Sequence, residues 1–125
     1  MTTYNPGKIV SIPAGADLSS SKYLGVKLNT SSQVIDMAAT ADICMGILQN
    51  EPVTGEAASV ALVNGGGISK IYLSGTLAAG ALVRADENGQ AAADAATNYN
   101  IGQLLTGGAV DELGEVILGN ITVKA

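Results

Sequence analysis

Two pairs of adjacent carboxylates are the residues best suited, by type, to acid–base chemistry. They are Asp86-Glu87 and Asp111-Glu112, and each pair stands near glycines in an expected surface turn. Neighbouring side chains on an extended strand or turn point apart, so the two carboxylates of a pair cannot act on one substrate atom. The chain also has no histidine, the commonest acid–base group. We therefore expect both pairs to be solvated charges.

Three short motifs have part of the pattern of known chemical sites, and each lacks a required component. Ser19-Ser20-Ser21-Lys22 has the Ser-x-x-Lys spacing of penicillin-recognising enzymes, but neither the Ser-Asp-Asn nor the Lys-Thr-Gly partner occurs. Gly65-Gly66-Gly67 lacks the Gly-Lys-Ser/Thr ending of a phosphate loop. Asp86-Glu87-Asn88-Gly89 lacks the closing glutamate of a calcium loop. We expect no catalytic residue, no cofactor site and no metal site, and therefore no enzyme.

Cys44 is the only cysteine, so no disulfide can form within the chain. It has no histidine or basic neighbour in the sequence that would lower its thiol pKa. We expect Cys44 to be a small core side chain and not a nucleophile.

The overall composition excludes some partners and favours association. The net charge is −5 and the pI is near 4.3, which disfavours nucleic acid because its binding requires neutralisation of phosphates. No apolar stretch is long enough to span a membrane, and the N-terminus shows no basic start followed by an apolar stretch. Phe and Trp are absent and there are four Tyr, so the core lacks its usual aromatic anchors. Small domains with thin cores often gain stability by associating.

The spacing of glycines and β-branched residues predicts an all-β domain with short strands. Sixteen glycines separate brief apolar segments. Some of these segments, such as Ile43–Leu48, are apolar on both faces, which leaves open a closed barrel, a sandwich or a covered interface. Ala91–Ala96 is expected to be a loop or short strand, and Asp86–Gly89 and Asn64–Gly67 are expected to be chain reversals. The expected strands are Tyr23–Leu28, Ile43–Gln49, Ala57–Val63, Ile68–Leu73, Ala81–Ala85, Ile101–Leu105 and Glu115–Val123.

One pattern occurs twice in the chain. Met45-Gly46-Ile47-Leu48 is followed by Gly55-Glu56 and then by a strand with Val60 and Leu62. Ile101-Gly102-Gln103-Leu104 is likewise followed by Gly114-Glu115 and then by Val116 and Leu118. The pattern is consistent with two similar hairpins that close one barrel, and equally with the chance recurrence of common hairpin residues.

The first dozen residues differ from the rest. Pro6 and Pro13 bracket a short run, Lys8–Ile12, and the residues before it have no apolar pattern. Such termini form extended arms or edge strands, or stay disordered. We divide the chain into an N-terminal arm, residues 1–12, and a single β-domain, residues 13–125.

The chain resembles the capsid decoration, or capsid cement, proteins of tailed bacteriophages. The resemblance runs from about Asn5 to Leu118, and its separate pieces occur in the order that this family shows. The pieces are Pro6-Gly7-Lys8-Ile9-Val10, Tyr23-Leu24-Gly25-Val26, Met45-Gly46-Ile47-Leu48, Gly55-Glu56-Ala57, Ala79-Gly80-Ala81-Leu82-Val83, Asp86-Glu87-Asn88-Gly89, Ile101-Gly102 and Gly114-Glu115-Val116-Ile117-Leu118.

The resemblance implies a compact β-barrel of the β-tulip type that forms a homotrimer. It implies a structural, non-enzymatic role: the trimer binds the major capsid protein on the outside of the head at three-fold or quasi-three-fold positions, after synthesis in the host cytoplasm. An N-terminal arm often contributes to such binding, which marks Tyr4, Asn5, Pro6 and Lys8 as the candidate capsid-binding residues. Deletion of residues 1–12 is then expected to weaken capsid binding and leave the domain folded.

Two alternatives stay open from the sequence. One is another virion part, such as a tail-tube or head-fibre domain. The other is a module displayed on the virion that binds a host surface or a glycan, in which case tyrosines would carry the binding.

Overall fold

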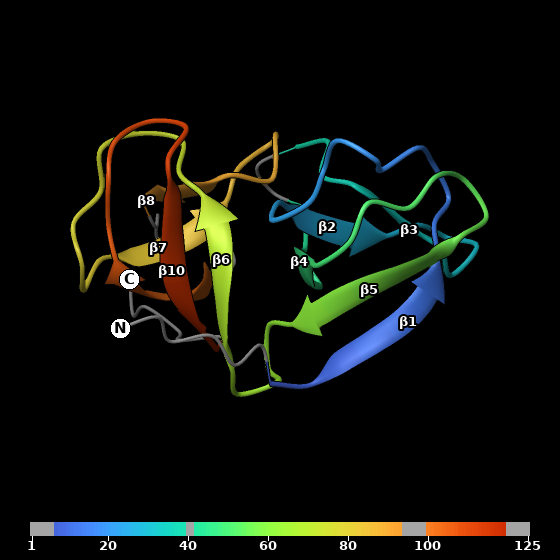
Figure 1. Cartoon of the computed structure of the whole chain (residues 1–125), viewed down its shortest axis with the longest axis horizontal. Coiled ribbons are helices and arrows are strands. Elements are labelled where there is room, and N and C mark those ends of the chain that lie inside the picture. The colour runs from blue at the N-terminus through green and yellow to red at the C-terminus, as the bar shows by residue number, and fades with distance from the viewer. Residues whose placement is uncertain (1–6, 40–41, 94–99, 120–125) are drawn as a thin grey trace.

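The structure, a computed structural model, describes residues 7–39, 42–93 and 100–119 (Figure 1). Within these residues the chain forms strands and no helix. The strands are β1 (Ile9–Pro13), β2 (Gly25–Leu28), β3 (Val34–Asp36), β4 (Gly46–Leu48), β5 (Ala57–Leu62), β6 (Ile68–Tyr72), β7 (Leu82–Ala85), β8 (Ala91–Ala93), β9 (Asn100–Thr106) and β10 (Leu113–Leu118).

The strands form two antiparallel five-stranded sheets, one from each half of the chain. The first has the order β1-β5-β4-β2-β3 and the second the order β6-β10-β9-β7-β8. Figure 1 shows the two halves side by side, with β1–β5 on the right and β6–β10 on the left. The all-β prediction is confirmed, and each expected segment overlaps a strand. Residues 120–123 of the expected segment Glu115–Val123 lie outside the described residues. Strand β3 was not predicted, because its three residues, Val34–Asp36, are too few to show a period.

A single compact barrel, as the resemblance implied, is not what the described residues form. Each sheet instead curls until its two edges meet at one isolated bridge, Ala14 with Val34 in the first half and Leu73 with Ala91 in the second. One bridge does not make a continuous ladder, so each half is a curled sheet around a cluster of buried side chains.

The two halves are copies of one architecture, and the twice-occurring pattern marks corresponding positions. Gly46 and Leu48 of β4 pair with Leu62 and Val60 of β5. Gly102 and Leu104 of β9 pair in the same way with Leu118 and Val116 of β10. The strand orders of the two sheets also match one for one. The recurrence in the sequence therefore reflects a repeated fold and not chance hairpin chemistry.

One part of that pattern was aligned wrongly in the sequence. The counterpart of Glu56 is Glu112 and not Glu115. Glu56 Oε1 accepts a hydrogen bond from the N–H of Val53, three residues before it, at 2.9 Å, and Glu112 Oε1 accepts one from the N–H of Ala109 at 2.7 Å. Both glutamates therefore stabilise the turn that precedes the last strand of their half.

The hairpins between β2 and β3 and between β7 and β8 are built alike. Asn29 Oδ1 accepts hydrogen bonds from the N–H groups of Ser31 and Gln33, both at 2.9 Å. Asp86 Oδ1 accepts them from Asn88 and Gln90, also at 2.9 Å. The expected reversal at Asp86–Gly89 is confirmed, and it depends on a side-chain cap in addition to its Asn-Gly pair.

Two clusters of buried side chains fill the molecule. The first lies inside the first half and contains Ala14, Leu18, Val26, Val34, Leu48, Ala58 and Val60. The second fills the other half and extends into the junction between the halves. It contains Met37, Cys44, Ile47, Ala61, Val63, Ile71, Leu73, Val83, Ala85, Ala91, Ile101, Leu104, Val116 and Leu118. Both clusters are purely non-aromatic, as the composition required.

Gly46 is a sensitive position because β4 and β5 approach most closely there. A methyl group on Gly46 would overlap the carbonyl oxygen of Ala61 and lie 2.7 Å from Val60 Cγ1. We expect Gly46→Ala to lower the free energy of unfolding by about 1–3 kcal/mol, as overpacking typically does. Urea unfolding measures this change, with Gly75→Ala as the control because a methyl group there meets open space. Equal midpoints for the two variants would show that β4 and β5 can separate at little cost.

Candidate functional site

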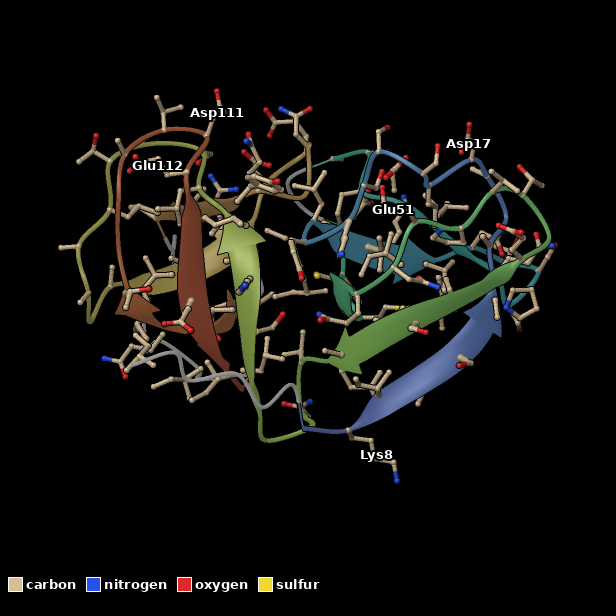
Figure 2. The ribbon with its side chains drawn as sticks, viewed as in Figure 1. Lys8, Asp17, Glu51, Asp111 and Glu112 are labelled. Atoms are coloured by element: carbon tan, nitrogen blue, oxygen red, sulfur yellow. The ribbon has the colours of Figure 1, made fainter. Side chains whose placement is uncertain are left out.

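The candidate capsid-binding residues lie at or before the start of the described chain. Tyr4, Asn5 and Pro6 are outside the described residues. Lys8 is exposed and directly precedes β1, and its side chain points away from the ribbon in Figure 2. Its backbone is anchored, because the Lys8 carbonyl accepts a hydrogen bond from Leu62 N–H at 3.0 Å. Lys8 is thus a surface cation on a fixed backbone.

The segment after Lys8 is an edge strand. Strand β1 pairs antiparallel with β5 from Ile9 opposite Ala61 to Pro13 opposite Ala57. Val10 and Ile12 are half-buried and pack against the first cluster. Residues 9–12, assigned above to the arm, therefore belong to the first sheet, and an arm can comprise only residues before them. Deletion of residues 1–12 would remove half-buried apolar side chains, so we no longer expect the domain to tolerate it.

Several acidic side chains lie on the opposite side of the molecule. Asp17, Glu51, Asp111 and Glu112 are all exposed and all lie on loops. In Figure 2 Asp17, Asp111 and Glu112 lie near the top of the molecule and Glu51 lies in its upper half, whereas Lys8 lies at the bottom. These four carboxylates are therefore on the side of the molecule opposite to Lys8.

The two carboxylates of each pair have different surroundings. Asp86 is buried and caps its hairpin, whereas Glu87 is exposed. Asp111 accepts a hydrogen bond from Gln90 Nε2 at 2.8 Å, and Glu112 braces its own turn. The expectation of solvated charge was wrong for Asp86, because the unpaired N–H groups of the hairpin require an acceptor.

A small basic and aromatic patch surrounds Tyr23, and the sequence did not reveal it. Lys22 Nζ lies 5.0 Å and Lys70 Nζ 5.9 Å from the centre of the Tyr23 ring, within the range of cation–π attraction. Tyr23 has a φ of 64°, which is rare for a bulky residue. Its counterpart is Gly80, with a φ of 89°. The sequence signal that could have revealed the unusual backbone at Tyr23 was Gly80, because a glycine at the corresponding position of the second half indicates a positive φ.

Within the described residues there is a single ion pair, and it holds the loop after β3 in place. Lys27 Nζ lies 2.8 Å from Asp42 Oδ2, and the N–H groups of Ala38 and Ala39 donate to the same oxygen. The hydrogen bond from Lys27, followed by the two backbone bonds, lowers the pKa of the Asp42 carboxyl. The position of Lys27 corresponds to that of Arg84, whose Nε and Nη1 are buried without a hydrogen-bond partner among the described residues.

The Asp42 carboxylate makes the stability of the fold depend on pH. Because its pKa is lowered in the folded chain, its stabilisation is present above the unfolded pKa of about 3.9 and is lost as the pH falls through the folded value. We expect the free energy of unfolding of Asp42→Asn to fall less steeply between about pH 5 and pH 2 than that of the wild type. Urea unfolding at several pH values measures the slope. Glu87→Gln, at an exposed site, is the control, and identical slopes for the wild type and Asp42→Asn would contradict the assignment.

Cys44 is a core residue, as expected. Its Sγ donates to the Gly46 carbonyl at 3.2 Å, and burial raises the pKa of the thiol to about 11. We expect no reaction with an aromatic disulfide reagent at pH 8 while the protein is folded, and full reaction in denaturant. Rapid labelling of the folded protein would show that this part of the junction opens.

The described residues contain no group of three or more His, Cys, Asp or Glu side chains placed to hold a metal ion. They also contain no helix that is long and apolar enough to cross a membrane. The absence of an enzymatic role remains a prediction from the sequence.

Comparison with solved structures shows a likeness of fold. The chain is similar to the head fiber gp8.5 N base of bacteriophage phi29, with a TM-score of 0.65 and 10% sequence identity. The likeness covers 94% of this chain and 98% of that chain, so it includes both halves. No family model matches the chain, and no curated protein matches it.

Proposed function

We propose that this protein is a structural component of a phage virion that binds the outer surface of the head. It does so as a self-associated unit, a trimer, which bridges neighbouring subunits of the major capsid protein and stabilises the shell against the pressure of packaged DNA. The observation that carries this proposal is the likeness to a phage head-fibre base over nearly the full length of both chains.

The physical properties of the chain support this role. A trimer that contacts several capsid subunits combines modest affinities through effective concentration, because the subunits cannot separate without breaking several contacts together. The position of Lys8 opposite Asp17, Glu51, Asp111 and Glu112 suggests an orientation in which Lys8 faces the shell and these carboxylates face outward. Tyr4, Asn5, Pro6 and Lys8 are then the capsid-binding residues.

The test is co-sedimentation with undecorated, expanded capsids of the phage that encodes the protein. We expect the wild type to saturate the capsids and to raise their temperature of disruption. Deletion of residues 1–7, which spares β1, should weaken the binding about tenfold or more, a loss of about 1.4 kcal/mol at least. Lys8→Glu should weaken it in the same direction.

Controls separate binding from folding. The circular dichroism spectrum and unfolding midpoint of the deletion variant should match those of the wild type. Glu51→Lys, a charge reversal on the side opposite to Lys8, should bind capsids like the wild type. A deletion variant of wild-type affinity would exclude the arm as the contact, and a wild type that does not sediment with capsids would refute the proposed function.

A second candidate is the base of a head fibre, which the fold likeness also favours. Such a base binds the head at isolated positions and carries a protruding domain, whereas a decoration protein covers the shell. Electron micrographs of virions labelled with an antibody against this chain distinguish the two by the distribution of the label: an even coat for decoration, and the feet of fibres for a base.

A further inference from the structure

The two halves of the chain meet through one face of the first sheet. On β4 and β5, Leu48 and Val60 point into the first cluster, whereas Ile47 and Ala61 point the opposite way. Ile47 and Ala61 are fully buried in the second cluster. Next to them, Gln49 Nε2 donates to Ser69 Oγ of β6 at 2.8 Å. The outer face of the first sheet thus closes the second half.

The corresponding face of the second half is exposed where the structure describes it. The pair Ile47 and Ala61 corresponds in register to Gln103 and Ile117. Leu105 follows Leu104 as Gln49 follows Leu48, but it lies at a bulge in β9, where Thr106 and not Leu105 pairs with Glu115. Ile117 is 41% and Leu105 37% exposed, and Gln103 is also exposed. We call Gln103, Leu105 and Ile117 the free outer face.

The outer face of the first sheet covers one surface of the second half, and the corresponding surface of the first half is partly exposed. In the second half, Ser69 accepts the hydrogen bond from Gln49, and Ile71, Ala85 and Ile101 belong to the same cluster as Ile47 and Ala61; all four are buried. By register, their counterparts in the first half are Val10, Ile12, Leu28 and Met45. All four are apolar, Leu28 is 47% exposed, and the other three are half-buried. We call these four residues the open side.

We propose that copies of this chain associate head to tail, with the free outer face of one copy packed on the open side of the next. The contact repeats between copies the junction that already joins the two halves within each chain. Because it uses two different surfaces, the contact is heterologous, and it gives a closed ring if the rotation from one copy to the next closes and an open filament if it does not. This proposal specifies the surfaces for the self-association included in the proposed function.

The side chains at the two free surfaces match each other. Within the chain, the junction holds a hydrogen-bonded polar pair, Gln49 with Ser69. At the proposed contact Val10 takes the place of Ser69, and the exposed residue that follows Leu104 is the apolar Leu105. Gln103, which takes the place of Ile47, donates its Nε2 hydrogen bond to the Gly80 carbonyl of its own half at 2.9 Å. A polar residue on one side alone would leave an unpaired buried group, so the joint change favours a second copy of this chain as the occupant.

Mixing two blocked variants tests the head-to-tail contact. Ile117→Asp blocks the free outer face, and Leu28→Asp blocks the open side. By light scattering we expect each variant alone to be monomeric where the wild type is oligomeric. A mixture of the two variants should give a dimer, because the intact open side of the Ile117→Asp variant binds the intact free outer face of the Leu28→Asp variant. A mixture that stays monomeric would overturn the proposal in favour of an isologous contact.

Leu113→Asp is the matched control. Leu113 lies on the same strand and the same face as Ile117 and is 43% exposed, but its counterpart Ala57 is exposed and lies outside the junction. We expect Leu113→Asp to associate like the wild type. If Ile117→Asp also associates like the wild type, the contact lies elsewhere.

A disulfide trap gives a second readout and works in solution or on capsids. The variant carries Val10→Cys and Leu105→Cys, with Cys44→Ala, and mild oxidation should link different chains on a non-reducing gel. A protein that binds capsids but forms no link would overturn this interface and spare the capsid role. A protein that forms disulfide-linked oligomers but does not bind capsids would support this interface and refute the capsid role.

Discussion

Strands β4 and β5 are buried on both faces, and the rest of the molecule depends on that constraint. One face supplies Leu48 and Val60 to the core of the first half, and the other supplies Ile47 and Ala61 to the core of the second. Neither half can therefore complete its packing independently of this pair of strands. The close approach at Gly46 brings the two strands together, so a single missing Cβ helps to hold both cores.

The scarcity of aromatic side chains explains why such sharing is needed. Seven buried residues form the first cluster, and the largest of them are leucines. Each such side chain contributes only about 1.5–3 kcal/mol when fully buried, against the entropy lost by ordering the chain. A half of this size gains by covering its open side with another sheet. The second half gains that cover from the first, while the first half keeps Leu28 exposed.

The same geometry relates the fold to the proposed role. A decoration protein or a fibre base needs broad contacts and a fixed shape in place of a reactive centre. The polar groups that first suggested chemistry, such as Asp86, Glu112 and Cys44, serve turns and packing instead. The surface presents Lys8, the carboxylates of Asp17, Glu51, Asp111 and Glu112, and two apolar surfaces. All of these are suited to contacts with other proteins.

The sequence by itself determined the class of the fold, the position of most strands (all except β1 and β3), the hairpin at Asp86–Gly89 and the recurrence of Met45–Leu48 as Ile101–Leu104. These features depend on near neighbours in the chain, through period-two alternation and the demands of tight turns. Only the tertiary structure decided that the strands divide into two sheets, that Glu56 corresponds to Glu112, and that Ile9–Pro13 is an edge strand. It also decided that Ala61 is covered while its counterpart Ile117 is exposed. Alternation shows that two faces exist, but which sheet covers which face depends on contacts between residues far apart in the chain, and no local pattern encodes them.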